Sequence, residues 1–255
     1  MVIMEESVYF YNASKERLSG FLHLPAGDYD KSIALAHCFT CSRHQKIMRN
    51  ICDTLAESGF LVLRFDFSGN GESEGRFEDA TYSKEISDLK SAISFLSTKN
   101  ASSFGVLGHS MGAAVSILHS AIDTRVSSLC VVGSPAESSS IKTIFSDATL
   151  KEIYSKGRAE VNIFSRKLTM TKEFFDDAEK HSIEKSLRTF TKPFCVVHGG
   201  LDSIIPVENA MKLYSYAKGQ KEIHIIDGAD HMFSDPGHLE MAQKIILDWF
   251  RKTCH

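Results

Sequence analysis

The hydrophobic positions of the chain form short apolar runs that alternate with stretches of helical period. Ile47, Ile51 and Leu55 recur every fourth residue and so share one face of a helix, which Gly59 ends. Apolar runs without that period predict buried strands, and the polar stretch between the first two predicts a hairpin. The expected strands are 8–11, 18–24, 33–36, 61–65, 104–107, 126–132, 194–197 and 223–226, and the further helices are 86–96, 113–120, 211–216 and 241–250. This alternation is typical of an α/β protein with a mainly parallel sheet.

Residues 134–192 break the alternation. Their apolar side chains, such as Ile141 and Ile144, lie among charged residues without a sustained period. Connections in α/β units usually take about 2 to 6 residues, so this segment is too long for a simple loop. We expect one domain over residues 1–255, with an inserted cap or lid at about residues 135–191.

Composition narrows the class of protein. A chain of 255 residues with 43% hydrophobic and 24% charged residues is not a disordered one. The net charge is −3 and the basic residues are scattered, so no nucleic-acid partner is expected. The first residues lack a secretory signal, and no apolar run reaches the roughly 18 residues of a membrane span. We therefore expect a cytoplasmic protein without a membrane span, and leave open whether it forms a homodimer.

The strongest chemical signal is the run GHSMG at residues 108–112. It follows the expected strand 104–107 and opens the helix that continues from Ala113, which is the context of a nucleophile elbow. Gly108 and Gly112 leave room for the sharp turn around Ser110. Because the turn sets the serine at a helix amino terminus, backbone N–H groups there can stabilise a developing oxyanion. Ser110 is therefore the candidate nucleophile.

A serine nucleophile needs a base and an orienting carboxylate later in the chain, in the order Ser, Asp, His. Asp202 follows the strand 194–197 on a short glycine-rich turn, and His231 follows the strand 223–226. We favour these two over Glu137 as an alternative acid and over Asp230, which adjoins the histidine. Two further histidines compete for the role of base. His109 sits beside the serine on the elbow, and His198 lies at the end of strand 194–197, where a structural hydrogen bond is expected.

The loop after strand 33–36 is expected to face the elbow and to supply a second oxyanion donor. We assign the two donors to the backbone N–H groups of Phe39 and Met111. The loop also contains Cys38 and Cys41 as a Cys-x-x-Cys pair between histidines, which leaves a redox role open. Zinc is disfavoured because structural sites usually draw ligands from two separated pairs, so no metal is expected. In a chain of this length without a secretion signal, the six cysteines are expected to be reduced.

A third signal, the run GNGESEG at residues 69–75, approaches a dinucleotide-binding fingerprint. Its last glycine comes one residue late and no helix follows directly. No acidic residue ends a second strand about 20 residues on, as a ribose-binding site requires. We interpret the run as a tight structural loop and expect no cofactor.

Nearly the whole chain resembles the α/β-hydrolase superfamily. The runs LAHCFTCS at 35–42 and RFDFSGNGESEG at 64–75 resemble the hydrolase part of bacterial proteins fused to an OsmC-like peroxidase domain. With residues 71–79 they also resemble cinnamoyl and feruloyl esterases, which carry an inserted lid. The resemblance implies an α/β-hydrolase fold with a mainly parallel eight-stranded sheet flanked by helices. It also implies Ser110, Asp202 and His231 as triad, with Phe39 and Met111 as oxyanion donors; Cys38 stands where the esterases carry glycine.

The leading hypothesis is a cofactor-free serine hydrolase that cleaves a small-molecule carboxylic ester through an acyl-enzyme on Ser110. In the lid, Phe164, Phe174 and Phe175 are expected to form an apolar pocket for aryl or medium-chain acyl groups. The same triad serves thioesterases and acyltransferases, which are the alternatives within the class. A redox protein using Cys38 and Cys41 and a non-catalytic binding member of the fold are the alternatives outside it.

Overall fold

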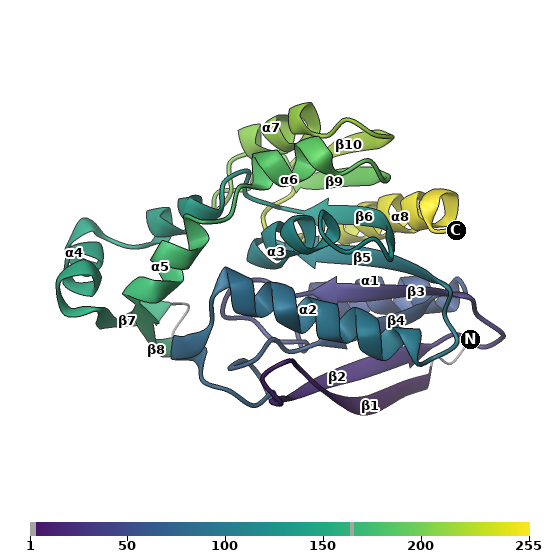
Figure 1. Cartoon of the computed structure of the whole chain (residues 1–255). Coiled ribbons are helices and arrows are strands. Elements are labelled where there is room, and N and C mark those ends of the chain that lie inside the picture. The colour runs from purple at the N-terminus through teal and green to yellow at the C-terminus, as the bar shows by residue number, and fades with distance from the viewer. Residues whose placement is uncertain (1–3, 164–165) are drawn as a thin grey trace.

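The computed structural model describes residues 4–163 and 166–255 and is built on one eight-stranded sheet (Figure 1). The strand order is β1-β2-β4-β3-β5-β6-β9-β10. Pairings β1 with β2 and β2 with β4 are antiparallel, and all others in this sheet are parallel. The strands are β1 (Met4–Tyr11), β2 (Arg17–Leu24), β3 (Lys31–Ala36), β4 (Leu61–Phe65), β5 (Ser103–His109), β6 (Val126–Val132), β9 (Phe194–Gly199) and β10 (Lys221–Ile226). The predicted α/β architecture is confirmed, because each expected strand overlaps one of these eight.

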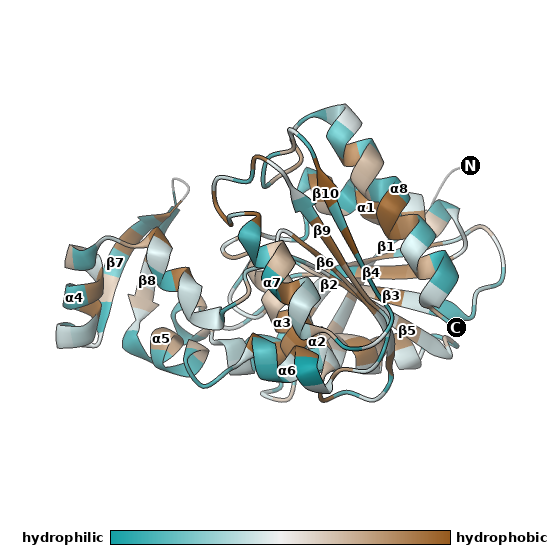
Figure 2. Cartoon of the chain, turned by 90° about the horizontal axis from the view of Figure 1, so that it is seen from above, coloured by the Kyte–Doolittle hydropathy of each residue, from teal (hydrophilic) through white to brown (hydrophobic). Residues whose placement is uncertain are grey.

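Helices cover both faces of the sheet (Figure 2). One face packs against α1 (Lys46–Glu57) and α8 (Pro236–Thr253). The other face packs against α2 (Tyr82–Ser97), α3 (Met111–Ser120), α6 (Ile183–Thr189) and α7 (Glu208–Tyr216). Each face has its own hydrophobic cluster, which is why the central strands read as continuous apolar runs rather than alternating ones. In the described part of the chain, no helix combines the length and the apolar character needed to cross a bilayer.

Local signals explain where the helices begin. The Thr81 side chain accepts a hydrogen bond from the Lys84 N–H at 3.1 Å and caps α2. Asp235 caps α8 by accepting from two N–H groups, and Pro236 occupies the first turn, where no amide donor is needed. After α1 the chain turns through Gly59 at φ +93°, the left-handed conformation that glycine adopts most readily.

Residues 133–193, between β6 and β9, are here called the inserted segment. They form η2 (Ser138–Ile144), α4 (Asp147–Lys156), the antiparallel pair β7 (Arg158–Ile163) and β8 (Arg166–Thr171), α5 (Lys172–Ala178) and then α6. The part from α4 to β8 projects away from the sheet, as Figures 1 and 2 both show. The sequence pattern gave no sign of these elements because each spans at most ten residues and exposes one side to solvent.

Hydrophobic packing joins the inserted segment to the eight-stranded sheet and its covering helices, here called the body. Ile153 and Phe175 are fully buried and belong to the same hydrophobic cluster as the α2 and α3 face of the sheet. Phe174 packs on Tyr82 of α2 with ring centroids 6.0 Å apart. The short helix η1 (Phe77–Asp79) lies beside β8. The segment therefore shares the core of the body instead of forming a separate one.

Candidate active site

Strand β5 ends in the predicted elbow. Ser110 has φ 56° and ψ −123°, a conformation costly for a residue with a side chain, and α3 starts at the next residue. A Cβ on Gly112 would lie 2.2 Å from the backbone oxygen of His37, and one on Gly108 would lie 2.5 Å from the Cα of Ala113. Both glycines are therefore required by close backbone approach, which is the role assigned to them from sequence.

Asp202 and His231 come together at the carboxyl ends of β9 and β10. The Nδ1 atom of His231 lies 2.7 Å from Oδ2 of Asp202. The other carboxylate oxygen of Asp202 accepts hydrogen bonds from the N–H groups of Ile204 and Ile205 at 2.9 and 2.8 Å. These bonds fix the direction of the carboxylate, so that it holds the proton of His231 on Nδ1 and leaves Nε2 as the basic nitrogen.

The charge on Asp202 is held by its partners. Burial raises the pKa of Asp202, but the hydrogen bond to His231, the charge of that imidazole, and the two N–H groups outweigh burial and lower the pKa below its ordinary value. The carboxylate is therefore ionised at neutral pH. An ionised acceptor next to Nδ1 stabilises an imidazolium, which is the species a base forms when it takes a serine proton.

The competing acids and histidines have other partners. Asp230 accepts hydrogen bonds from the N–H groups of Met232 and Ser234, within its own turn. Glu137 is exposed and pairs with Lys212 at 3.5 Å. His198 bonds the backbone oxygen of Ile205 at 2.8 Å, the structural role expected for it, and the same Nε2 atom lies 3.4 Å from Oδ2 of Asp202, farther than the 2.7 Å of His231.

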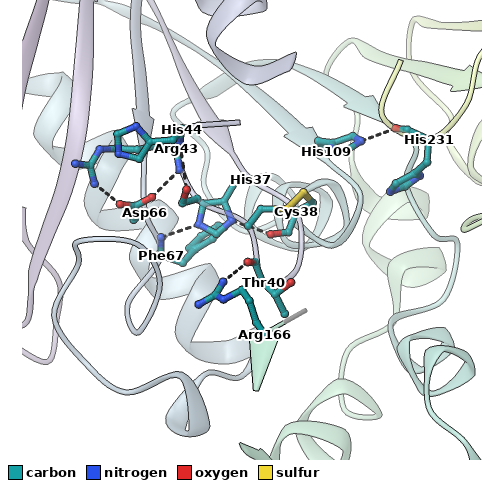
Figure 3. The surroundings of a disulfide bond; sticks show 12 residues. His37, Cys38, Thr40, Arg43, His44, Asp66, Phe67, His109, Arg166 and His231 are labelled. Carbon is teal, nitrogen blue, oxygen red and sulfur yellow. Dashed lines mark hydrogen bonds and ion pairs between the residues drawn. A yellow bond between two sulfur atoms is a disulfide. The ribbon is translucent and has the colours of Figure 1, made fainter. Parts of the chain in front are cut away.

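His109 stacks near the imidazole of His231 and donates through Nε2 to that residue's backbone oxygen at 2.9 Å (Figure 3). Burial, together with the neighbouring charge of His231, lowers the pKa of His109 to about 3. His109 is thus a neutral donor that fixes the backbone of the loop carrying His231.

The loop after β3 carries Phe39, whose N–H is a candidate oxyanion donor. The buried His37 donates from Nδ1 to the Cys38 oxygen at 2.8 Å, and its Nε2 accepts from the Phe67 N–H at 3.1 Å. Burial lowers the pKa of His37, so the ring is neutral and keeps this arrangement. Because the Cys38 oxygen and the Phe39 N–H belong to one peptide group, fixing the oxygen also fixes the direction of the N–H.

Cys38 and Cys41 form a disulfide bond, with Cα atoms 5.3 Å apart (Figure 3). The expectation that all six cysteines are reduced is wrong for this pair. The chain turns between them, with the Cys41 N–H donating to the Cys38 oxygen at 3.1 Å, and this turn brings the two sulfur atoms together. The other four cysteines are free and buried, namely Cys52, Cys130, Cys195 and Cys254.

A buried ion pair anchors the far end of this loop. The Arg43 N–H donates to Oδ1 of Asp66 at 2.6 Å, and the Arg43 guanidinium pairs with Oδ2. Oδ2 also accepts from the Glu72 N–H at 3.0 Å. A Cβ on Gly71 would lie 2.1 Å from this carboxylate. The glycine-rich run 69–75 therefore wraps around Asp66, in agreement with its interpretation as a structural loop.

A cavity of about 360 Å³ opens beside the elbow and is lined by Ser110, His231, Phe39 and Met111. Further apolar lining comes from the body and from η2 of the inserted segment, through Tyr82, Ile204, Ile205, Met232, Ile141 and Ile144. Arg166 of β8 also lines it and donates from Nη1 to the Thr40 oxygen. The four residues implied as nucleophile, base and oxyanion donors thus share one largely apolar cavity.

The predicted lid phenylalanines take other places. Phe174 and Phe175 are fully buried and are not among the residues lining the cavity. Phe174 packs behind Phe39, with ring centroids 5.6 Å apart, and therefore supports the wall from the second layer. Phe164 lies outside the described residues. These phenylalanines follow no helical or strand period in the sequence. The sequence therefore could not show whether they line the cavity or pack behind its lining.

The side chains that do line the cavity were largely missed. Ile204 and Ile205 follow Asp202 in the chain, and Met232 follows His231, so adjacency to a predicted catalytic residue was the available signal. Within residues 4–163 and 166–255, no group of three or more His, Cys, Asp and Glu side chains is arranged to hold a metal ion.

The parallel sheet, the elbow at Ser110 and the acid and histidine on the following strands define an α/β hydrolase. Residues 28–177 match the family described as serine aminopeptidase S33. The chain belongs to this family of hydrolases.

The solved structures that are similar to the chain include esterases. The esterase domain of a Rhodothermus marinus protein is 27% identical, with a TM-score of 0.76 over 98% of this chain and 99% of that domain. Est1E from Butyrivibrio proteoclasticus, solved with ferulic acid bound, has a TM-score of 0.85 over 96% of this chain and 98% of its own. At 22% identity it is similar in fold. The palmitoyl-protein thioesterase ABHD10 of Homo sapiens, a mitochondrial protein, is 27% identical over 165 residues, which cover 61% of this chain and 51% of that protein.

Proposed function

We propose that the protein is a serine hydrolase that cleaves carboxylic esters through an acyl-enzyme on Ser110. The observation that carries the proposal is the 2.7 Å contact between His231 and Asp202, because His231 lines the same cavity as the elbow serine. An imidazole with its Nδ1 proton held by a carboxylate is the base that a serine hydroxyl needs.

In the proposed reaction His231 takes the proton of Ser110 as the hydroxyl attacks the ester carbonyl carbon. The N–H groups of Phe39 and Met111 stabilise the oxyanion, each donor typically contributing about 10²- to 10³-fold to the rate. The protonated His231 then gives its proton to the departing alcohol. A water molecule, deprotonated by the same imidazole, releases the acid and restores the serine.

The cavity wall supports an ester with an apolar acyl or leaving group. Ile141, Ile144 and Met232 offer hydrophobic contact, and the inserted segment would act as a lid over the bound substrate. Phe174 contributes by supporting Phe39, and a contact from Phe164 remains a prediction. Arg166 adds one positive charge to this wall, so a substrate with one anionic group besides its apolar part fits best.

Thioester hydrolysis is the second candidate. It is favoured by the relation to ABHD10, which is named a palmitoyl-protein thioesterase. A thioester carbonyl is attacked in the same way and leaves a thiolate instead of an alkoxide, so the triad needs no change. Acyl transfer differs only in the second step, where an alcohol or amine replaces water.

Labelling with a fluorophosphonate tests the nucleophile. The wild type should be labelled, and Ser110→Ala should lose both the label and the hydrolysis of p-nitrophenyl esters. Ser116→Ala is the matched control, because this serine lies on α3 and bonds its own helix. Absence of label on the wild type, or equal label on Ser110→Ala, would refute the mechanism. Esters of graded chain length, methyl ferulate and an acyl-CoA then rank the substrate classes.

A further inference from the structure

The Cys38–Cys41 disulfide lies in the wall of the candidate active-site cavity, and no step of the proposed hydrolysis uses it. Both cysteines line the cavity together with Phe39 and Thr40, the two residues between them. Cys38 is 6% exposed, whereas Cys41 is partly exposed. Of the two residues, Cys41 is therefore the more accessible to a small molecule.

The disulfide closes a ring around the candidate oxyanion donor. The Phe39 N–H belongs to the peptide group whose oxygen, on Cys38, accepts from His37 and from the Cys41 N–H. Thr40 is held at φ 58°, a left-handed conformation that a residue with a branched side chain seldom adopts. The disulfide is the covalent part of the constraints that keep this turn in place.

We propose that the Cys38–Cys41 disulfide is a thiol-exchange site, at which a small-molecule thiol entering the cavity opens the bond and lowers the rate of hydrolysis at Ser110. This inference rests on the proposed function, because the effect is read through ester hydrolysis.

The exchange consumes two small-molecule thiols for each protein disulfide that is reduced. The thiolate of the first attacks Sγ of Cys41, the bond between the two cysteines breaks, and its electron pair leaves on Sγ of Cys38, which takes up a proton. A second thiolate attacks the sulfur of the bound small molecule and releases the Cys41 thiolate, which is protonated in turn. Two small thiols are oxidised to their disulfide, and the two cysteines are reduced.

The remaining cysteines do not compete for the reagent. Burial raises the pKa of the Cys52 and Cys254 thiols. The hydrogen bond with Cys130, and also the neighbouring His224, lower the pKa of Cys195 to about 7 against the effect of burial. Cys195 is nevertheless fully buried in the folded protein, so its thiol is out of reach.

Opening the ring leaves the Phe39 N–H in the chain and removes the covalent constraint on its direction, while the hydrogen bond from His37 to the Cys38 oxygen remains. We therefore expect kcat to decrease by about tenfold, which is less than the decrease expected if the Phe39 donor were lost altogether. The Michaelis constant should change little, because the apolar lining residues Ile141, Ile144 and Met232 lie outside the ring. An increase in KM with kcat unchanged would instead indicate damage to the substrate pocket.

The test uses the full chain with and without dithiothreitol. Thiols are counted in the native protein with a chromogenic disulfide reagent, and p-nitrophenyl butyrate hydrolysis is followed in parallel. We expect two new thiols, a decrease in kcat of about tenfold, and recovery after removal of the dithiol and reoxidation. Cys41→Ser should have the low kcat from the start and be indifferent to dithiothreitol, whereas Cys254→Ser should respond like the wild type.

Three outcomes would overturn the proposal: two new thiols with unchanged kcat, no new thiols in the native protein, or a Cys41→Ser variant that keeps the wild-type rate. The comparison of wild type with and without dithiothreitol needs no substitution, so it does not depend on how well a variant folds. Failure of the proposed function looks different, because neither ester turnover nor fluorophosphonate labelling of Ser110 would then occur in either state.

Discussion

The imidazole Nδ1 of His231 and the carboxylate Oδ2 of Asp202 are 2.7 Å apart, although 29 residues separate them in the sequence. The contact joins the loops that follow β9 and β10, two neighbouring parallel strands. Gly133, at the end of β6, lies against both side chains, and a Cβ there would be 3.2 Å from the His231 ring and 3.5 Å from Asp202. Three adjacent strand ends thus shape the contact between this carboxylate and this imidazole.

The first prediction concerns this pair. Asp202→Asn should lower kcat by up to about 10⁴-fold, because an amide can donate to Nδ1 and so favour the wrong tautomer of His231. Asp230→Asn is the control, since Asp230 accepts from the N–H groups of Met232 and Ser234 in its own turn and an amide oxygen can still accept them. Steady-state hydrolysis of a p-nitrophenyl ester measures both. Equal losses in the two variants would contradict the assignment of Asp202.

The second prediction concerns the guanidinium in the cavity wall. Arg166→Gln should raise KM by about 10- to 100-fold for esters that carry a carboxylate, since hydrogen bonds to charged groups contribute about 1.5–3 kcal/mol. Neutral esters of the same length should be affected little. Lys167→Gln is the control, because Lys167 is exposed and pairs with Glu160 at 2.7 Å. An equal loss on neutral and anionic esters would show that Arg166 only supports the loop.

A third prediction tests the close approach at the elbow. Gly112→Ala should lower the free energy of unfolding by about 1–3 kcal/mol or more, because the added Cβ meets the backbone oxygens of His37 and Ala36 at 2.2 and 2.5 Å. Gly27→Ala is the control, since nothing lies within 4 Å of a Cβ there. Urea unfolding of the two variants measures the difference. Similar stabilities would mean that the turn can relax at no cost.

The fourth prediction is a pH dependence of stability. Burial, and next the charge of Asp88, raise the pKa of Glu85 well above 4.5, so the folded protein keeps a proton that the unfolded chain releases. The free energy of unfolding therefore decreases as the pH rises above about 4.5. Glu85→Gln removes this cost and should raise the melting temperature at pH 8, by about 2–4 °C for each kcal/mol gained.

Near pH 4 the Glu85→Gln variant and the wild type should melt alike, because Glu85 is then protonated in both states. Glu57→Gln, at an exposed position of α1, should follow the wild type at every pH. The comparison is made by thermal unfolding from pH 4 to pH 8. A difference in melting temperature between Glu85→Gln and the wild type that stays the same from pH 4 to pH 8 would contradict the predicted titration of Glu85.

Much of the body could be predicted because its strands are buried on both faces. The expected strands 61–65 and 126–132 have the observed bounds, since continuous apolar runs end where the chain leaves the core. The elbow was predicted for a similar reason: Gly108 and Gly112 are required by backbone contacts that few other sequences satisfy. Asp202 and His231 followed from the order of strands.

The inserted segment was harder to predict, because its fold depends on contacts with the body. Phe174 and Phe175 were expected to face the substrate, yet contacts with Tyr82 and Phe145 bury them behind the wall. The disulfide was missed because spacing alone does not tell whether two cysteines are oxidised. The turn that joins them depends on hydrogen bonds from His37 and Cys41 that the sequence does not display.

The position of β10 at the edge of the sheet has a consequence for inactivation. His231 follows this strand, which is only half-buried over most of its length and pairs on one side with β9. Ser110 follows β5, in the fully buried centre. An edge strand opens at a lower free energy than the core of the same domain. Under mild denaturant the proposed base is therefore lost first, and the proposed hydrolysis should cease while the helices and the central strands are still folded.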